Sequence, residues 1–188
     1  MKKLIKPLGI ISAVSFVLMI AGGIILLFTP MGVPAIYEGT NGFGVFDFRF
    51  SYTADNVMTI FSHYTGDRST DWVRYYVIDF IFAFFAACFM ISLPLRFYAE
   101  DDRHYLLFRA SVFSALMTLL FNVIENILIL RLLNITPYFS EGEADIASGI
   151  TVLKWVFAAV WLGSSLLFII ATIIHGVRQK YRPRRLKK

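Results

Sequence analysis

Four long apolar stretches constrain the fold of this chain more than any other feature of its sequence. They cover residues 8–28, 72–93, 105–133 and 150–174. A helix that crosses a bilayer needs roughly 20 predominantly apolar residues, and each stretch meets that requirement. Apolar residues make up 57% of the chain and charged residues 16%, against about 45–50% and about 25% in soluble domains. We therefore predict an all-α membrane protein, a four-helix transmembrane bundle. The composition excludes a soluble enzyme, a disordered protein and a disulfide-framework secreted domain.

The predicted domain organisation is a single membrane domain over residues 1–175, followed by a basic tail over 176–188. Proline removes a backbone donor and clashes with the preceding helical turn, so Pro94 and Pro137 are expected to end the second and third helices. The first stretch could also be a secretory signal peptide, but its apolar run exceeds the usual 7–15 residues. We therefore favour an uncleaved membrane anchor.

The distribution of basic residues predicts the orientation. Of the 18 lysines and arginines, 13 lie in the N-terminal segment, in the connection over residues 96–109 and in the tail. Cytoplasmic segments of membrane proteins carry such an excess, so both termini should be cytoplasmic. The long loop over residues 29–71 should then face outside. Because topology explains the basic ends, we predict no nucleic-acid partner and expect membrane lipids as partners instead.

No cofactor or metal ion is predicted. The chain has one cysteine, Cys88, which excludes an intrachain disulfide and makes a cysteine-based zinc site implausible. The three histidines, His63, His104 and His175, are dispersed along the chain. No glycine-rich phosphate loop or nucleophile-elbow motif occurs.

The outer loop should be ordered rather than a plain connector. Aromatic residues alternate with polar ones from Phe46 to Tyr52, and this period of two predicts a strand with one aromatic face. Thr53 is placed to cap a short helix, and Val57, Ile60 and Phe61 would share one face of it. We therefore expect a small α+β loop. Its apolar side could pack on the bundle, lie among lipid headgroups or contact a partner protein.

Ionisable residues within the apolar stretches carry most of the functional information, because a charge at membrane depth needs a partner and must face protein or water. Asp79 lies about 10 Å along the second helix from Trp72, and Glu125 lies about 12 Å along the third helix before Leu133. These two helices run in opposite directions, so both carboxylates should lie at similar depth in the outer half. Lys154 follows about one turn inside the fourth stretch. We predict that the two carboxylates are direct or near neighbours.

Further polar and aromatic residues fall on the same sides of these helices. The spacing of three and four residues gives a polar stripe on the third helix and a second stripe on the fourth. The candidate catalytic residues are Asp79, Glu125 and Lys154. The candidate binding residues are Asn122, Asn126, Tyr75, Tyr76 and Trp161, with Arg74 or Arg131 covering the cluster from above.

Two interpretations of this cluster remain open. It could be an interhelical hydrogen-bond network that only stabilises the bundle. It could also be a site in which two carboxylates and a lysine perform acid/base chemistry or proton coupling. The first hypothesis for function is therefore a non-enzymatic membrane module that binds a lipid or protein partner through its outer face. The alternative is a membrane-embedded acid/base enzyme or a small proton-coupled carrier, which with four helices would have to form a homo-oligomer.

Short motifs resemble those of a group of uncharacterised bacterial four-span membrane proteins. That group carries a D-x-R-x-x-Y segment outside, an Asp in the second span and a Glu-Asn pair in the third. The matching residues here are Asp47, Arg49 and Tyr52, then Asp79, then Glu125 and Asn126. The resemblance covers residues 46–126 and implies a bacterial inner-membrane location, without implying an activity. The layout also resembles that of claudin-like four-span proteins, although their Trp and paired-Cys signature is absent from the first loop.

Overall fold

The computed structural model describes residues 5–65, 67–100 and 104–180. Four of its helices are long and apolar enough to cross a membrane. They are α1 (Ile5–Phe28), α4 (Arg68–Glu100), α5 (Tyr105–Ile135) and α6 (Glu141–Lys180). The prediction of an all-α chain with four apolar helices is confirmed, and these helices are compatible with an integral membrane protein.

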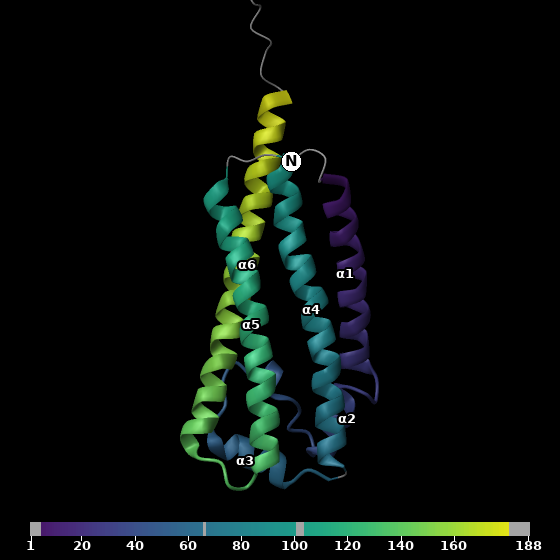
Figure 1. The fold of residues 1–188 in the computed structure, drawn as a ribbon, viewed down its shortest axis with the longest axis vertical. Coiled ribbons are helices and arrows are strands. Elements are labelled where there is room, and N and C mark those ends of the chain that lie inside the picture. Colours follow the sequence, from purple (N-terminus) through teal and green to yellow (C-terminus); the bar gives the residue numbers. More distant parts are fainter. Residues whose placement is uncertain (1–4, 66, 101–103, 181–188) are drawn as a thin grey trace, which may run out of the picture.

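The long helices pack in a row rather than in a closed ring. Helix α1 packs on α4, α4 packs on α5, and α5 packs on α6, as the ribbon in Figure 1 shows. Among the described residues, α1 and α6 share no substantial contact. The two central helices, α4 and α5, therefore form a floor of the bundle, with α1 packed along one side of it and α6 along the other.

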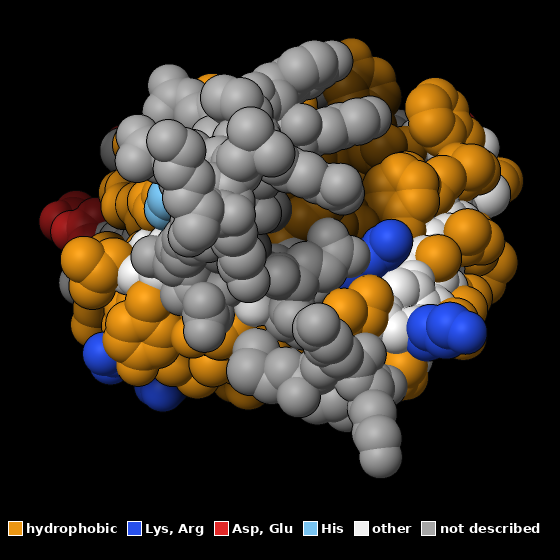
Figure 2. All heavy atoms as spheres, turned by 90° about the horizontal axis from the view of Figure 1, so that it is seen from above, with side chains coloured by type: hydrophobic (Ala, Val, Ile, Leu, Met, Phe, Trp, Pro, Cys, Tyr) orange, Lys and Arg blue, Asp and Glu red, His pale blue; other side chains and the backbone are white. Residues whose placement is uncertain are grey.

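Large apolar side chains cover the outward sides of the helices. Ile10 and Val17 on α1 and Ile170 and Ile173 on α6 are all exposed. Figure 2, which views the molecule along the bundle, shows hydrophobic side chains around most of its perimeter. Contact of such an apolar surface with water is unfavourable, whereas contact with lipid tails is not, so these faces suit a bilayer.

The bundle has two distinct ends. Helix α1 begins and α6 ends at one of them, and the segment between α1 and α4 lies at the other, which we call the distal end (Figure 1). Residues 1–4 and 181–188 lie outside the described part of the chain. Most of the predicted basic tail, residues 176–188, is therefore not described. The connection between α1 and α4, residues 29–67, is called the distal segment below.

The distal segment is helical, so the predicted α+β loop is wrong. It contains α2 (Val33–Gly39), the 3₁₀ turn η2 (Phe46–Phe48) and α3 (Ala54–Ser62). No strand occurs within the described residues 5–65 and 67–100. A 3₁₀ helix turns by about a third of a circle per residue, which breaks the alternation that a strand would preserve. Phe46 is consequently buried together with its neighbour Asp47, whereas Phe48 is 61% exposed.

The predicted helix after Thr53 is confirmed as α3. Thr53 Oγ1 accepts from the Asn56 backbone N–H, and Asn56 Oδ1 accepts from the Thr53 N–H, which forms a reciprocal cap. Val57, Ile60 and Phe61 are buried on its inner face, as the spacing predicts.

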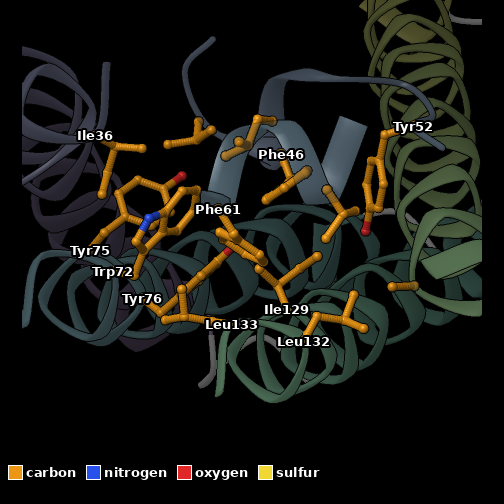
Figure 3. Close-up of a cluster of buried hydrophobic side chains, with 14 of the residues drawn as sticks. Ile36, Phe46, Tyr52, Phe61, Trp72, Tyr75, Tyr76, Ile129, Leu132 and Leu133 are labelled. Carbon is orange, nitrogen blue, oxygen red and sulfur yellow. The ribbon is translucent and has the colours of Figure 1, made fainter. Parts of the chain in front are cut away.

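An aromatic core attaches the distal segment to the bundle. The Phe46 ring lies 5.4 Å from that of Phe61 and 5.7 Å from that of Trp72 on α4, measured between centroids. Figure 3 shows these rings gathered between the distal segment and the ends of α4 and α5. Of the three locations considered for the apolar side of this segment, the structure shows packing on the bundle.

Pro94 does not end α4, which continues to Glu100. A proline inside a helix leaves the carbonyl four residues earlier without its usual donor, here the carbonyl of Met90. Trp161 Nε1 on α6 donates to that oxygen at 2.9 Å. A neighbouring helix therefore satisfies the group that Pro94 leaves free, as happens at prolines in membrane helices. The third helix ends at Ile135, two residues before Pro137, as predicted.

This compensation predicts coupling between Pro94 and Trp161. Trp161→Phe should destabilise the protein by about 1 kcal/mol through loss of the hydrogen bond to Met90. In the Pro94→Ala background the restored backbone N–H competes for the same oxygen, so the loss should be smaller. A double-mutant cycle on unfolding of the detergent-solubilised protein measures the difference, which should exceed about 0.5 kcal/mol. Additive effects would show that the indole does not replace the missing donor.

Candidate functional site

A buried lysine joins two carboxylates at the distal half of the bundle. Lys154 Nζ on α6 donates to Asp47 Oδ1 at 2.8 Å and also forms an ion pair with Glu125 Oε2 on α5. All three side chains are at most 10% exposed. Thr151, one turn earlier on α6, donates to Glu125 Oε1 at 2.6 Å. We call Asp47, Glu125 and Lys154 the ionic triad.

Asp47 links the distal segment to two long helices. Its second oxygen, Oδ2, accepts from the hydroxyl of Tyr75 on α4 at 3.0 Å, while Oδ1 accepts from Lys154. Asp47 is not among the predicted site residues, because strand alternation places it on the polar side of the segment. The D-x-R-x-x-Y motif includes Asp47 but implies no role for it, and its burial depends on the 3₁₀ turn.

Asp79 lies in a second polar group formed by α4 and α5. The side-chain amides of Asn122 and Asn126, one helical turn apart, donate to Asp79 Oδ2 at 2.9 and 2.7 Å. Within the described ranges the other oxygen, Oδ1, accepts no hydrogen bond. The predicted grouping of Asp79 with the two asparagines is therefore present.

Asp79 and Glu125 have different partners. Asp79 is held by amides, and Glu125 is held by Lys154 and Thr151. No hydrogen bond joins the two carboxylates in the part of the chain that the structure describes. Both polar groups include a residue of this part of α5, because Glu125 directly precedes Asn126, which donates to Asp79. That the two carboxylates are near neighbours stays a prediction.

A cavity of about 300 Å³ adjoins both polar groups. Its polar lining consists of Asp47, Tyr75, Asp79, Asn122, Thr118 and Lys154. Its remaining walls are apolar and come chiefly from Leu26, Leu27, Phe82, Ala86, Met90 and Ala158. All four long helices contribute, and the cavity lies where α1 and α6 flank the floor of α4 and α5.

The cavity is polar at one end and apolar along its length. On α4 its lining runs from Tyr75 and Asp79 through Phe82 to Met90. Met90 follows Asp79 by eleven residues, which corresponds to about 16 Å along the helix. Small residues on this side, Ala86 on α4 and Gly23 on α1, leave the space open. Such a shape suits an amphipathic molecule rather than a compact polar one.

Four predicted site residues do not join the cluster. Arg131 pairs with Glu143 at 2.7 Å and Arg74 pairs with Asp71 at 3.7 Å, so neither covers the site from above. Trp161 donates to the backbone of Met90, further from the distal end. Tyr76 is fully buried against Trp72, with ring centroids 5.9 Å apart. Arg74 and Arg131 are exposed, so the depth of a residue along its helix was not enough to place it at the site.

The hydroxyls around the triad act as neutral donors and acceptors. Tyr52, in the distal segment, has its hydroxyl 3.2 Å from that of Thr151, next to Glu125. Burial raises the pKa of Tyr52 well above its ordinary value, and the nearby carboxylate charges add to this effect. The phenol therefore remains protonated and contributes no charge to the site.

The described residues include no three His, Cys, Asp or Glu side chains arranged to hold a metal ion. No family model matches the chain, and neither a curated protein nor a solved structure matches it. The resemblance to bacterial four-span proteins therefore stays a prediction.

Proposed function

We propose that this chain is a non-enzymatic membrane module that binds one amphipathic, lipid-like molecule in the cavity between α1 and α6. The observation that supports this function is the division of the cavity, with polar side chains at one end and apolar walls over about 16 Å beyond them. Its volume lies at the lower limit of ligand pockets, which is about 300 Å³. That volume suits a single alkyl chain.

The position of the cavity supports entry from the bilayer. Helices α1 and α6 share no substantial contact among the described residues, and side chains of both helices line the cavity, so we infer that it opens toward the bilayer between them. A lipid-like molecule would pass between two apolar helices without crossing water. Entry from the bilayer favours a membrane lipid over a protein as the partner, which narrows the hypothesis drawn from the sequence.

A second candidate function is a membrane-embedded acid/base enzyme or proton-coupled carrier that uses Asp79 and Glu125. The observation in its favour is that Asp79 lines the cavity and that no donor among the described residues contacts its Oδ1. Glu125 does not line the cavity and is paired with Lys154. The two carboxylates are thus not presented together to a ligand, and we favour binding over catalysis.

Filling the cavity tests the proposed function. A dodecanol that carries a photoreactive diazirine on its chain should label the detergent-solubilised protein saturably. Ala158→Phe places a ring into the cavity and should reduce saturable labelling at least fivefold. Ala159→Phe is the matched control, because Ala159 is exposed and does not line the cavity. Equal labelling of both variants would contradict the proposal.

We also propose that both termini are cytoplasmic and that the distal segment is extracytoplasmic, in a bacterial inner membrane. The excess of basic residues near the termini supports this orientation. Reporter fusions after Lys188 should report a cytoplasmic location, and fusions within residues 39–44 should report the opposite side. Reporters on the same side would contradict a four-span arrangement.

A further inference from the structure

The polar end of the cavity has more acidic than basic side chains in and beside its lining. Two carboxylates, those of Asp47 and Asp79, line it with one ammonium, that of Lys154, and a third carboxylate, that of Glu125, pairs with this ammonium from outside the lining. Their formal charges leave two negative charges uncompensated by these four residues. The remaining polar groups, including Tyr75 and the two asparagines, are neutral donors. A carboxylate charge without a compensating cation is unfavourable in a medium of low dielectric constant, and a bound cation would offset this cost.

Asp79 is the carboxylate that a ligand can reach. Both oxygens of Asp47 accept hydrogen bonds, from Lys154 and Tyr75, and Glu125 does not line the cavity. Asp79 does line it, and among the described residues only its Oδ2 accepts hydrogen bonds. Its side chain is more than nine-tenths buried, so few water molecules can hydrate the free oxygen. A ligand that donates to Asp79 Oδ1 would therefore meet an acceptor with no protein partner.

We propose that the cavity selects an amphiphile whose polar end is an ammonium group with N–H donors, and that Asp79 Oδ1 accepts from it. This inference rests on the proposed function, because it assigns the headgroup of the molecule bound there. The ammonium supplies both the charge and the donor that the site lacks, while the alkyl chain lies along Phe82, Ala86 and Met90. Hydrogen bonds between charged groups are about twice as strong as neutral ones.

Lys154 does not turn the cavity into an anion site. Its ammonium contacts both Asp47 and Glu125, so two carboxylates already compensate its single charge. An anionic headgroup would also lie near Asp79. Carboxylate and sulfate amphiphiles should therefore bind more weakly than neutral alcohols of the same chain length.

Competition against the photoreactive dodecanol measures the headgroup preference in the wild-type protein. Dodecylamine should displace the probe at about a tenfold lower mole fraction than dodecanol, and dodecanoate should be the weakest competitor. Dodecyltrimethylammonium has the charge without N–H donors and should fall between the amine and the alcohol. Phosphatidylethanolamine, compared with phosphatidylcholine, tests whether a bilayer lipid can supply the ammonium in place of a single-chain amine.

Asp79→Asn tests whether the preference for an amine headgroup depends on the charge of Asp79. The variant keeps the shape of the side chain but removes its charge, so the ratio between amine and alcohol should fall to near one. Asp71→Asn is the matched control on the same helix, because Asp71 lies outside the cavity and pairs with Arg74 and Tyr64. It should keep the tenfold ratio.

The possible failures are distinguishable. If the amine and the alcohol compete equally in the wild-type protein, the ammonium assignment is wrong while the proposed lipid site stands. If the probe shows no saturable labelling that any amphiphile reduces, the proposed function itself fails. Size-exclusion chromatography identifies a variant that does not fold. In that case the competition of dodecylamine and dodecanol in the wild-type protein alone tests the ammonium headgroup.

Discussion

Lys154→Met should destabilise the protein by about 3–5 kcal/mol near neutral pH, because it leaves Asp47 and Glu125 buried without their common cation. Unfolding in detergent, followed by the loss of helical circular dichroism, measures this change. Arg131→Met is the control. The Arg131–Glu143 pair lies at the surface, so its loss should cost less than about 1 kcal/mol.

The deficit caused by Lys154→Met should shrink at low pH, where the two carboxylates bind protons and no longer need the ammonium. It should also shrink when the partners are neutralised together, in the combined variant Asp47→Asn, Lys154→Met and Glu125→Gln. Neutral replacement of a whole buried ionic group is often tolerated, whereas removal of one partner is not. A deficit that neither low pH nor neutralisation reduces would show that the lysine acts through packing rather than charge.

Phe46→Ala should destabilise the protein by about 3–5 kcal/mol, whereas Phe48→Ala should have an effect within about 0.5 kcal/mol. Phe46 is fully buried and its ring contacts those of Tyr52, Phe61 and Trp72. Phe48 is 61% exposed. The same unfolding measurement compares the two variants.

This pair of variants separates the 3₁₀ turn from a strand. In a strand, Phe46 and Phe48 would point to the same face and the two alanine variants would have similar effects. In the turn, Phe46 is buried in the aromatic core that Figure 3 shows, whereas Phe48 is exposed. Equal losses of stability would therefore favour the strand and contradict the described burial of Asp47.

The long helices could be predicted because their physical signal is local and strong. Four apolar stretches are each long enough to cross a bilayer, and the observed helices contain all four predicted ranges. The second helix continues past Pro94, contrary to the prediction, because Trp161 on α6 supplies the donor that proline removes. Local propensity does not contain that information.

The candidate site could be predicted in part. Helical spacing placed Asp79 with Asn122 and Asn126, and depth placed Lys154 near Glu125. Asp47 could not be found this way, because its position depends on a turn between long helices rather than on periodicity. Arg74 and Arg131 were assigned to the site by depth alone, and nearby acidic residues hold them elsewhere.

The most direct test of the central claim, that the cavity holds an amphiphile, is to map where the photoreactive dodecanol attaches to the wild-type protein. Mass spectrometry of peptides should locate the saturable label on cavity residues such as Leu27, Ala86 and Met90. Excess unlabelled dodecanol should remove it from those positions. Label spread over outward-facing residues such as Ile10 and Leu106, with none at the cavity walls, would contradict the account.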